Sequence, residues 1–169
     1  AFRGHKGRVR TISLSERHQI LASGSDDKTI KLWDIQTGDC LLTVDDKSQL
    51  RTITFSPDGQ HLASAGLNKV VKLRQANTGD WVRDVTTHDE PVLSLSFSPD
   101  GKTLASGGES GILHLSELDT DNCSKKLSVD SPYKGMNLDG ATGLSESQSE
   151  TLASLGALNP QSERPLSKV

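Results

Sequence analysis

The sequence predicts an all-β fold in which three similar four-stranded antiparallel units occupy residues 1–130, followed by a tail that carries one short helix. The first observation is a repeat. The tetrapeptide Ser-Pro-Asp-Gly at residues 56–59 returns 42 residues later, and Thr-Gly-Asp at residues 37–39 returns after 41 residues. The second observation is that short apolar stretches alternate with these turn-forming peptides, as in β-hairpins. Such a period, about 40 to 45 residues, is typical of a four-stranded repeating unit.

The first unit shows how the strands are assigned. Residues 20–23 lead into a tight turn at Asp26, Asp27 and Lys28, and residues 29–34 return as a second apolar strand, which predicts a β-hairpin. Because the pattern recurs in each unit, we expect strands at residues 9–14, 20–23, 29–34 and 40–44, at 50–55, 61–65, 70–74 and 81–85, and at 92–97, 103–106, 112–116 and 123–127.

The pair Gly4-His5 upstream of this hairpin and the pair Trp33-Asp34 at its end resemble the signature of the WD-repeat (WD40) family, whose fold is the β-propeller. The resemblance implies three blades, at about residues 5–45, 46–87 and 88–129, and makes residues 1–3 the end of an outer strand from a missing blade. Since propellers have about four to eight blades, an open arc is expected. Residues 132–158 resemble the tails of large multidomain bacterial WD-repeat proteins, which implies that the chain is the C-terminal part of such a protein.

In this family, four side chains of each blade form a buried hydrogen-bond chain, and the resemblance assigns these roles to His5, Ser23, Asp27 and Trp33. Three of the four, His5, Ser23 and Asp27, also have the composition of a catalytic triad. The structural interpretation is favoured because it accounts for Trp33 as well and for the place of all four residues in the repeat. We therefore expect no catalytic residue and no enzymatic activity.

The later repeats depart from this pattern. The second blade retains only Ser64, and the third blade retains His88 and Ser106. The replaced positions carry Asp46, Asn68, Arg74, Ser110 and Ser116. Partners that are lost together leave no buried group unpaired, so we expect these two blades to be held by packing rather than by a polar network.

The tail is predicted at residues 131–158. Ser145 and Gln148 have the spacing of a capping box, which predicts a helix from about residue 146 to residue 155. We expect this helix to pack on the third blade and cover its outer face. Residues 159–169, with two prolines and mixed charges, are expected to be a disordered end.

Composition excludes several classes of function. The chain has 169 residues, 33% of them hydrophobic, and a net charge of −3, so we expect neither a nucleic-acid partner nor a membrane span. Cys40 and Cys123 hold the same repeat position two blades apart, too far for a disulfide, which favours free thiols in the cytoplasm. Neither cysteine has a second ligand at metal-binding spacing, and no cofactor is implied.

Other candidate sites remain. Asp26 and Asp27 have the composition of a metal pair, but adjacent carboxylates in a β-turn are commonly turn chemistry. Residues 107–111, rich in glycine, are interpreted as a hairpin turn rather than a phosphate-binding loop, since no Lys-Ser/Thr ending follows. Trp81 is expected on the outer rim, where packing against a neighbouring strand is favoured over a binding role. The candidate partner-binding residues are Arg8, Arg10, Asp26 and Arg51, for which solvated charge is the alternative.

The predicted function is a non-catalytic protein–protein interaction scaffold, because loops on a rigid propeller carry its binding sites. The expected partners are other proteins or peptides, the remaining blades of a parent propeller, or another copy of the chain. The alternative is the sensor or regulatory end of a bacterial signalling NTPase or protein kinase whose catalytic domain lies upstream.

Overall fold

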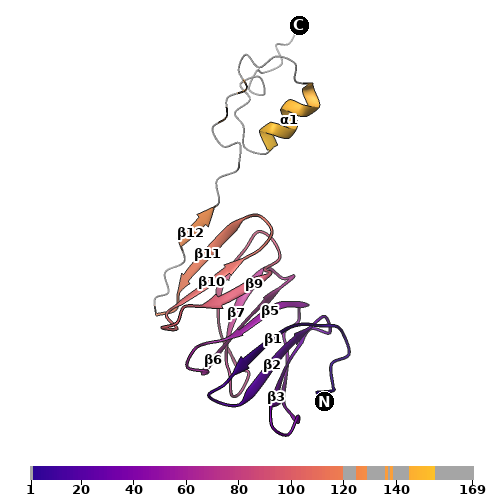
Figure 1. Cartoon of the computed structure of the whole chain (residues 1–169), viewed down its shortest axis with the longest axis vertical. Helices are drawn as coiled ribbons and strands as arrows, with labels where there is room; N and C mark the ends of the chain where they lie inside the picture. Colours follow the sequence, from indigo (N-terminus) through magenta and orange to yellow (C-terminus); the bar gives the residue numbers. More distant parts are fainter. Residues whose placement is uncertain (1, 120–124, 129–135, 137, 139–144, 155–169) are drawn as a thin grey trace. The chain divides into compact units, whose positions relative to one another are not determined.

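The computed structural model describes residues 2–119, 125–128, 136, 138 and 145–154, and the chain divides into two units, residues 1–128 and 129–169. The first unit contains three four-stranded antiparallel sheets, which follow one another in chain order from indigo to orange in Figure 1. Blade one comprises β1 (Val9–Ser15), β2 (Ile20–Ser25), β3 (Thr29–Asp34) and β4 (Cys40–Asp45). Blade two comprises β5 (Leu50–Phe55), β6 (His61–Gly66), β7 (Val70–Gln75) and β8 (Trp81–Thr87). Blade three comprises β9 (Ser94–Phe97), β10 (Thr103–Gly107), β11 (Ile112–Glu117) and β12 (Lys125–Ser128).

In every blade the strands pair with their sequence neighbours, so each sheet is a simple meander. The Ser-Pro-Asp-Gly peptides form the turns between the first and second strands of blades two and three. In blade two, the Asp58 carboxylate accepts hydrogen bonds from the Ser56 hydroxyl and from the Gln60 amide. Gly59 follows with a φ of 72°, a left-handed conformation that glycine adopts without strain. The predicted fold class, an open arc of three propeller blades with one short helix in the tail, is thus confirmed.

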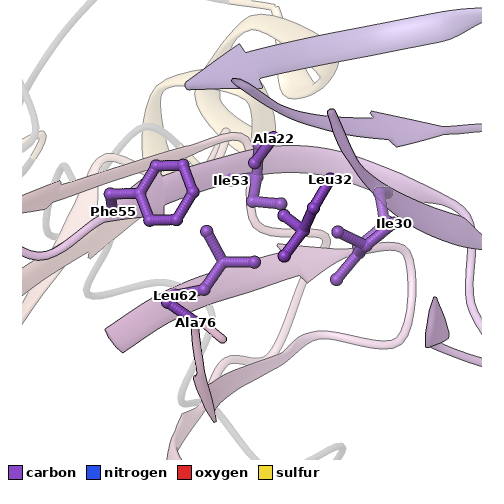
Figure 2. Packing of buried hydrophobic residues seen from close by; sticks show 8 residues of the cluster. Ala22, Ile30, Leu32, Ile53, Phe55, Leu62 and Ala76 are labelled. Carbon is purple, nitrogen blue, oxygen red and sulfur yellow. The ribbon is translucent and has the colours of Figure 1, made fainter. Parts of the chain in front are cut away.

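The blades are held together by apolar clusters between consecutive sheets. Ile30 and Leu32 of β3 pack against Ile53 and Phe55 of β5, with Ala22 beside them (Figure 2). A second cluster joins blade two to blade three through Ala63, Ala65, Val71, Leu73, Val92, Leu95 and Leu104. Burying one such large side chain contributes about 1.5–3 kcal/mol, so these interfaces dominate the stability of the arc.

Most strands end one or two residues later than predicted, and two other differences have a structural reason. Phe2 and Arg3 form no strand, because ladder hydrogen bonds require a neighbouring strand, and the Phe2 ring lies instead edge-on to Trp33 with centroids 5.8 Å apart. β9 begins at Ser94 rather than at residue 92, since the Val92 amide donates to the Gly66 carbonyl of blade two and leaves the ladder. β12 begins at Lys125, and the predicted start at residue 123 lies outside the described residues.

The second unit contains helix α1 (Glu146–Ser154). Its start has the predicted capping box: the Ser145 hydroxyl accepts from the Gln148 amide at 3.3 Å, and the Gln148 side chain accepts from the Ser145 amide at 2.9 Å. The packing of this helix on blade three remains a prediction. The expected disordered end, residues 159–169, lies outside the described residues.

Candidate functional site

The first blade brings His5, Ser23, Asp27 and Trp33 together in one network. The His5 ring connects the turn to the second strand, with Nδ1 2.9 Å from Asp27 Oδ2 and Nε2 2.8 Å from Ser23 Oγ. The indole Nε1–H of Trp33 donates to the same serine oxygen at 2.8 Å. The network therefore ties the segment before β1 to β2, to the β2–β3 turn and to β3.

Asp27 is the charged member of this network. Its carboxylate accepts from the Thr29 hydroxyl at 2.6 Å and from the Lys6 amide at 2.7 Å, in addition to the His5 ring. Burial by itself raises the pKa of Asp27, but the hydrogen bonds from Thr29, Lys6 and His5 outweigh it and hold that pKa well below its ordinary value. The carboxylate is thus ionised and fully used in fixing the turn.

The same geometry argues against using Ser23 as a nucleophile. Ser23 is buried, and its hydroxyl oxygen already accepts the indole N–H of Trp33. A catalytic serine needs a hydroxyl that reaches substrate and donors aimed at the developing oxyanion. The residues of the triad-like set are instead mutually satisfied, as in a structural network.

The second blade carries an ionic network at the equivalent positions, which corrects the expectation that packing alone holds it. Asp46, at the histidine position, lies 2.9 Å from the guanidinium Nη2 of Arg74, at the tryptophan position. Lys72 Nζ donates to Asp46 Oδ1 at 2.9 Å and to the Asp46 carbonyl at 2.8 Å, and Ser64 Oγ donates to Oδ2 at 3.3 Å. Blade two thus has an ionic network where blade one has a histidine–serine–indole network, because an anion and a cation stand at the two positions together.

The third blade has a histidine pair. His88 Nε2 lies 2.8 Å from Ser106 Oγ, and the His88 ring stacks on the His114 ring with centroids 3.9 Å apart. His114 Nδ1 in turn lies 2.9 Å from Thr86 Oγ1. Burial lowers the pKa of both histidines, and the neighbouring Lys126 lowers both further.

Among the described residues, the buried side-chain atoms without a hydrogen-bond partner are Asn68 Oδ1, Arg74 Nε and Ser116 Oγ. All three belong to positions at which the later repeats depart from the first. An unpaired buried polar group costs about 1–3 kcal/mol. The altered networks of blades two and three are therefore less completely satisfied than that of blade one.

The predicted partner-binding residues gather around one carboxylate. Arg10 of β1 donates from Nε to Asp26 Oδ2 at 2.9 Å, and Arg51 of β5 donates from Nη1 to Oδ1 at 2.7 Å. Arg8 joins through its backbone, since its carbonyl accepts the Asp26 amide at 2.9 Å. The hydrogen bond from Arg10 lowers the pKa of Asp26. This arginine cluster, defined by Arg8, Arg10, Asp26 and Arg51, thus crosses from blade one to blade two.

The other candidates have plain structural places. Asp26 and Asp27 are engaged by arginines and by turn donors, respectively, and no group of three potential metal ligands occurs among the described residues. Residues 108–111 form the turn between β10 and β11. Trp81 is exposed on β8, and its indole donates to Asp84 at 3.0 Å. Cys40 is a free, exposed thiol, whereas Cys123 lies outside the described residues.

Sequence reasoning missed Lys72 and His114. Both stand two residues before the tryptophan position, where blade one has Lys31, whose Nζ donates to Thr43 on the outer strand. In blades two and three, the side chains at this position, Lys72 and His114, instead contact the network residues Asp46 and His88. The sequence indicates Lys72 indirectly. An aspartate, Asp46, stands at a position that is buried in this family, and the third strand of the same blade carries two cations, Lys72 and Arg74.

No helix within the described part of the chain has the length and apolar character needed to span a membrane.

Comparisons with known proteins agree with the repeat geometry. Relatives from Drosophila virilis, Drosophila erecta and Drosophila melanogaster, each a "Ribosome biogenesis protein BOP1 homolog", are 48% identical over 44 residues, which is 26% of this chain and 6% of each relative. The matched segment is thus a small part of these proteins. The family model for the "WD domain, G-beta repeat" matches residues 1–34, 38–74 and 79–115. The chain belongs to the WD40 repeat family.

Proposed function

We propose that the chain is a non-catalytic scaffold for protein–protein interaction, and that the arginine cluster binds an acidic segment of a partner protein. WD40 repeats support the scaffold role in general. The specific observation is the charge balance of the cluster, in which the guanidinium groups of Arg10 and Arg51 share the Asp26 carboxylate and Arg8 adds a third arginine. Arg8 and Arg10 are exposed, so their remaining donors face solvent.

The geometry favours a carboxylate-bearing ligand. Asp26 holds the guanidinium groups of Arg10 and Arg51 close together on its two oxygens. Arginine recognises carboxylates through paired N–H donors. Because the whole chain has a net charge of −3, we do not expect it to attract nucleic acid or an anionic membrane over a long range.

A peptide-binding measurement tests the proposal. Fluorescence anisotropy is measured with a fluorescent glutamate-rich peptide and with the matching glutamine peptide, at low and at physiological salt. We expect salt-sensitive binding of the acidic peptide that is lost in Arg8→Gln/Arg10→Gln and retained in Lys102→Gln, which removes an exposed cation from the β9–β10 turn. Equal binding by both variants, or binding of neither peptide by the native chain, would contradict the proposal.

The non-catalytic part of the proposal has its own test. The purified chain is assayed for turnover of ester and peptide substrates, and none is expected. Steady turnover that Ser23→Ala abolishes would show that the buried network of blade one is a catalytic triad after all.

The match to the relatives supports a WD40 repeat in this chain and nothing about their biological role. The relatives named for ribosome biogenesis are matched over 6% of their length, so that role stays with them. The alternative function, the regulatory end of a bacterial signalling NTPase or protein kinase, requires a catalytic module upstream of Ala1. A phosphate-binding loop or kinase signature in the upstream coding sequence favours this alternative, and further repeats alone favour the scaffold.

A cytoplasmic location completes the proposal. The free, exposed thiol of Cys40 supports it, because a reducing compartment preserves such a group. Fractionation of cells that express the full-length protein tests the location, and recovery in a secreted or membrane fraction would contradict it.

A further inference from the structure

Equivalent positions in the three repeats differ in exposure on one side of blade one. Ile12, Ile53 and Leu95 occupy the same place on the first strand of each blade. Ile53 and Leu95 are 4% and 9% exposed because the preceding blade covers them, whereas Ile12 is 63% exposed. Leu14 is likewise exposed, while its equivalent Phe55 is buried. We call this exposed side of blade one the β1 face, defined by Val9, Ile12 and Leu14.

Blade three likewise exposes apolar residues that are covered in the other blades, here on the side that would face a following blade. Ile30 and Val71 occupy equivalent places on the third strands of blades one and two, and both are 0% exposed because the next blade covers them. The equivalent residue of blade three, Leu113, is 46% exposed, and Leu127 beside it on β12 is exposed as well. We call this side of blade three the β11 face, defined by Leu113, Leu115 and Leu127.

The two faces also match in hydrogen bonding. Between blades one and two, the hydroxyls of Thr11 and Ser13 each accept a backbone amide of β5, from Ile53 and Phe55, at 3.1 Å. The serines at the equivalent positions of β9 are exposed on the β11 side, and β1 pairs with β2 in the same register as β5 with β6. The amides of β1 that correspond to these donors therefore face the uncovered side. These exposed groups are Ser94, Ser96 and the amides of Ile12 and Leu14.

We propose that two copies of this chain associate head to tail, with the β1 face of each copy covering the β11 face of the other. The contact repeats the apolar positions that join consecutive blades and the hydroxyl–amide pairs that join blade one to blade two. A head-to-tail contact forms a closed assembly when its rotation returns to the start. Two copies supply six blades, which lies within the range of about four to eight that closed propellers use.

Two other arrangements give different results. If the tail helix α1 covers the β11 face, that face is closed to a second copy and the chain stays monomeric. If two β1 faces pair with each other, the β11 face plays no part in association. Variants that place a charge on one face at a time separate these arrangements from the head-to-tail dimer.

The test uses sedimentation velocity on the full chain over a dilution series. We expect the native chain to have twice the monomer mass, and Ile12→Lys and Leu113→Lys each to be monomeric, because a buried unpaired lysine disrupts the contact. An equal mixture of the two variants restores the doubled mass, since each retains the face that the other lacks. Leu67→Lys, in the exposed β6–β7 turn, is the matched control and remains dimeric.

Several results would overturn the proposal. These are a monomeric native chain, a dimeric Leu113→Lys variant, which indicates pairing of β1 faces, or a mixture of the two variants that stays monomeric although each has native circular dichroism. Hydrogen exchange on the native chain gives a test without mutation. The amides of Ile12 and Leu14 must become more protected as concentration rises, and exchange that is independent of concentration contradicts head-to-tail association.

Discussion

Blades one and two place polar networks at the same repeat positions and build them from different chemistry. In blade one a histidine links a carboxylate to a serine that also accepts an indole N–H. In blade two, Asp46 stands at the histidine position and Arg74 at the tryptophan position, and Arg74 Nη2 lies 2.9 Å from Asp46 Oδ2. Both networks tie the segment before the first strand to the second and third strands. The comparison shows that the connection between these strands is retained although the residues that make it differ.

The two networks differ in how completely they are satisfied. Asp46 and Arg74 are buried, so their charges have lost hydration that the ion pair must offset. Arg74 Nε and Asn68 Oδ1 have no partner among the described residues. Blade one leaves no such atom at its four positions within the described part of the chain. We therefore expect blade two to open before blade one.

The largest effect is expected from Asp46→Ala. This change leaves the cations of Arg74 and Lys72 facing each other in a buried site, and removal of one partner from such a pair costs about 3–5 kcal/mol. Urea unfolding measures the loss. Asp45→Ala is the matched control, because its contact with Lys47 is exposed and surface pairs contribute little. Equal midpoints for the two variants would show that the ionic network does not stabilise blade two.

A somewhat smaller effect is expected from Trp33→Ala. Loss of a large buried aromatic costs about 3–5 kcal/mol, and here the lower end applies because exposed Phe2 packs beside the ring and can move into the space. The matched control is Trp81→Ala, on the exposed face of β8. Thermal unfolding of both variants checks the difference, and similar shifts would remove Trp33 from the network of blade one.

The pH dependence of stability distinguishes blade three from the other two. Burial is the largest cause that lowers the pKa of His88 and of His114. Lys126 lowers both pKa values further and Asp89 opposes the shift of both, while His114 also lowers the pKa of His88 and Glu90 raises it. A histidine whose folded pKa is lowered binds its proton more readily when unfolded. The stabilisation is therefore complete above the ordinary pKa of 6.5 and is lost as the pH falls toward the folded pKa.

Hydrogen exchange resolved by blade measures this dependence between about pH 7.5 and about pH 5. We expect β10 and β11 to lose protection in this range, and the double variant His88→Gln/His114→Gln to remove the dependence. Asp27 of blade one acts at lower pH, because its lowered pKa gives stability that is lost as the pH falls below the ordinary value of 3.8. Unchanged protection of β10 and β11 in the native chain would contradict the histidine-pair account.

The smallest effect on stability is expected from Asp26→Asn, since this carboxylate and its arginine partners lie near the surface, where ion pairs are screened. Unfolding midpoints should barely change. Binding of an acidic peptide should become several-fold tighter, because the negative charge within the arginine cluster is removed. Weaker binding would mean that Asp26 orders the arginines more than it competes with the ligand.

Much of this architecture can be predicted from spacing. The period of 41 or 42 residues located the strands and the turns, because each repeat must present the same faces to its neighbours, and the resemblance to the WD-repeat family assigned the four network positions of blade one. The altered networks could not be obtained in the same way. Asp46 and Arg74 are 28 residues apart and look like two independent losses until the sheet brings them together. His114 occupies a position that holds a lysine in blade one, and its stacking on His88 appears only when the sheet places the two rings 3.9 Å apart.

The central claim, that Asp46 and Arg74 act as one unit in blade two, is tested most directly by a double-mutant cycle. The free energies of unfolding of Asp46→Ala, Arg74→Leu and the double variant are compared with that of the native chain. We predict that the double variant loses clearly less stability than the sum of the two single losses, with a coupling energy of about 1–3 kcal/mol. Costs that add without coupling would contradict the claim and would mean that blade two is held by packing alone.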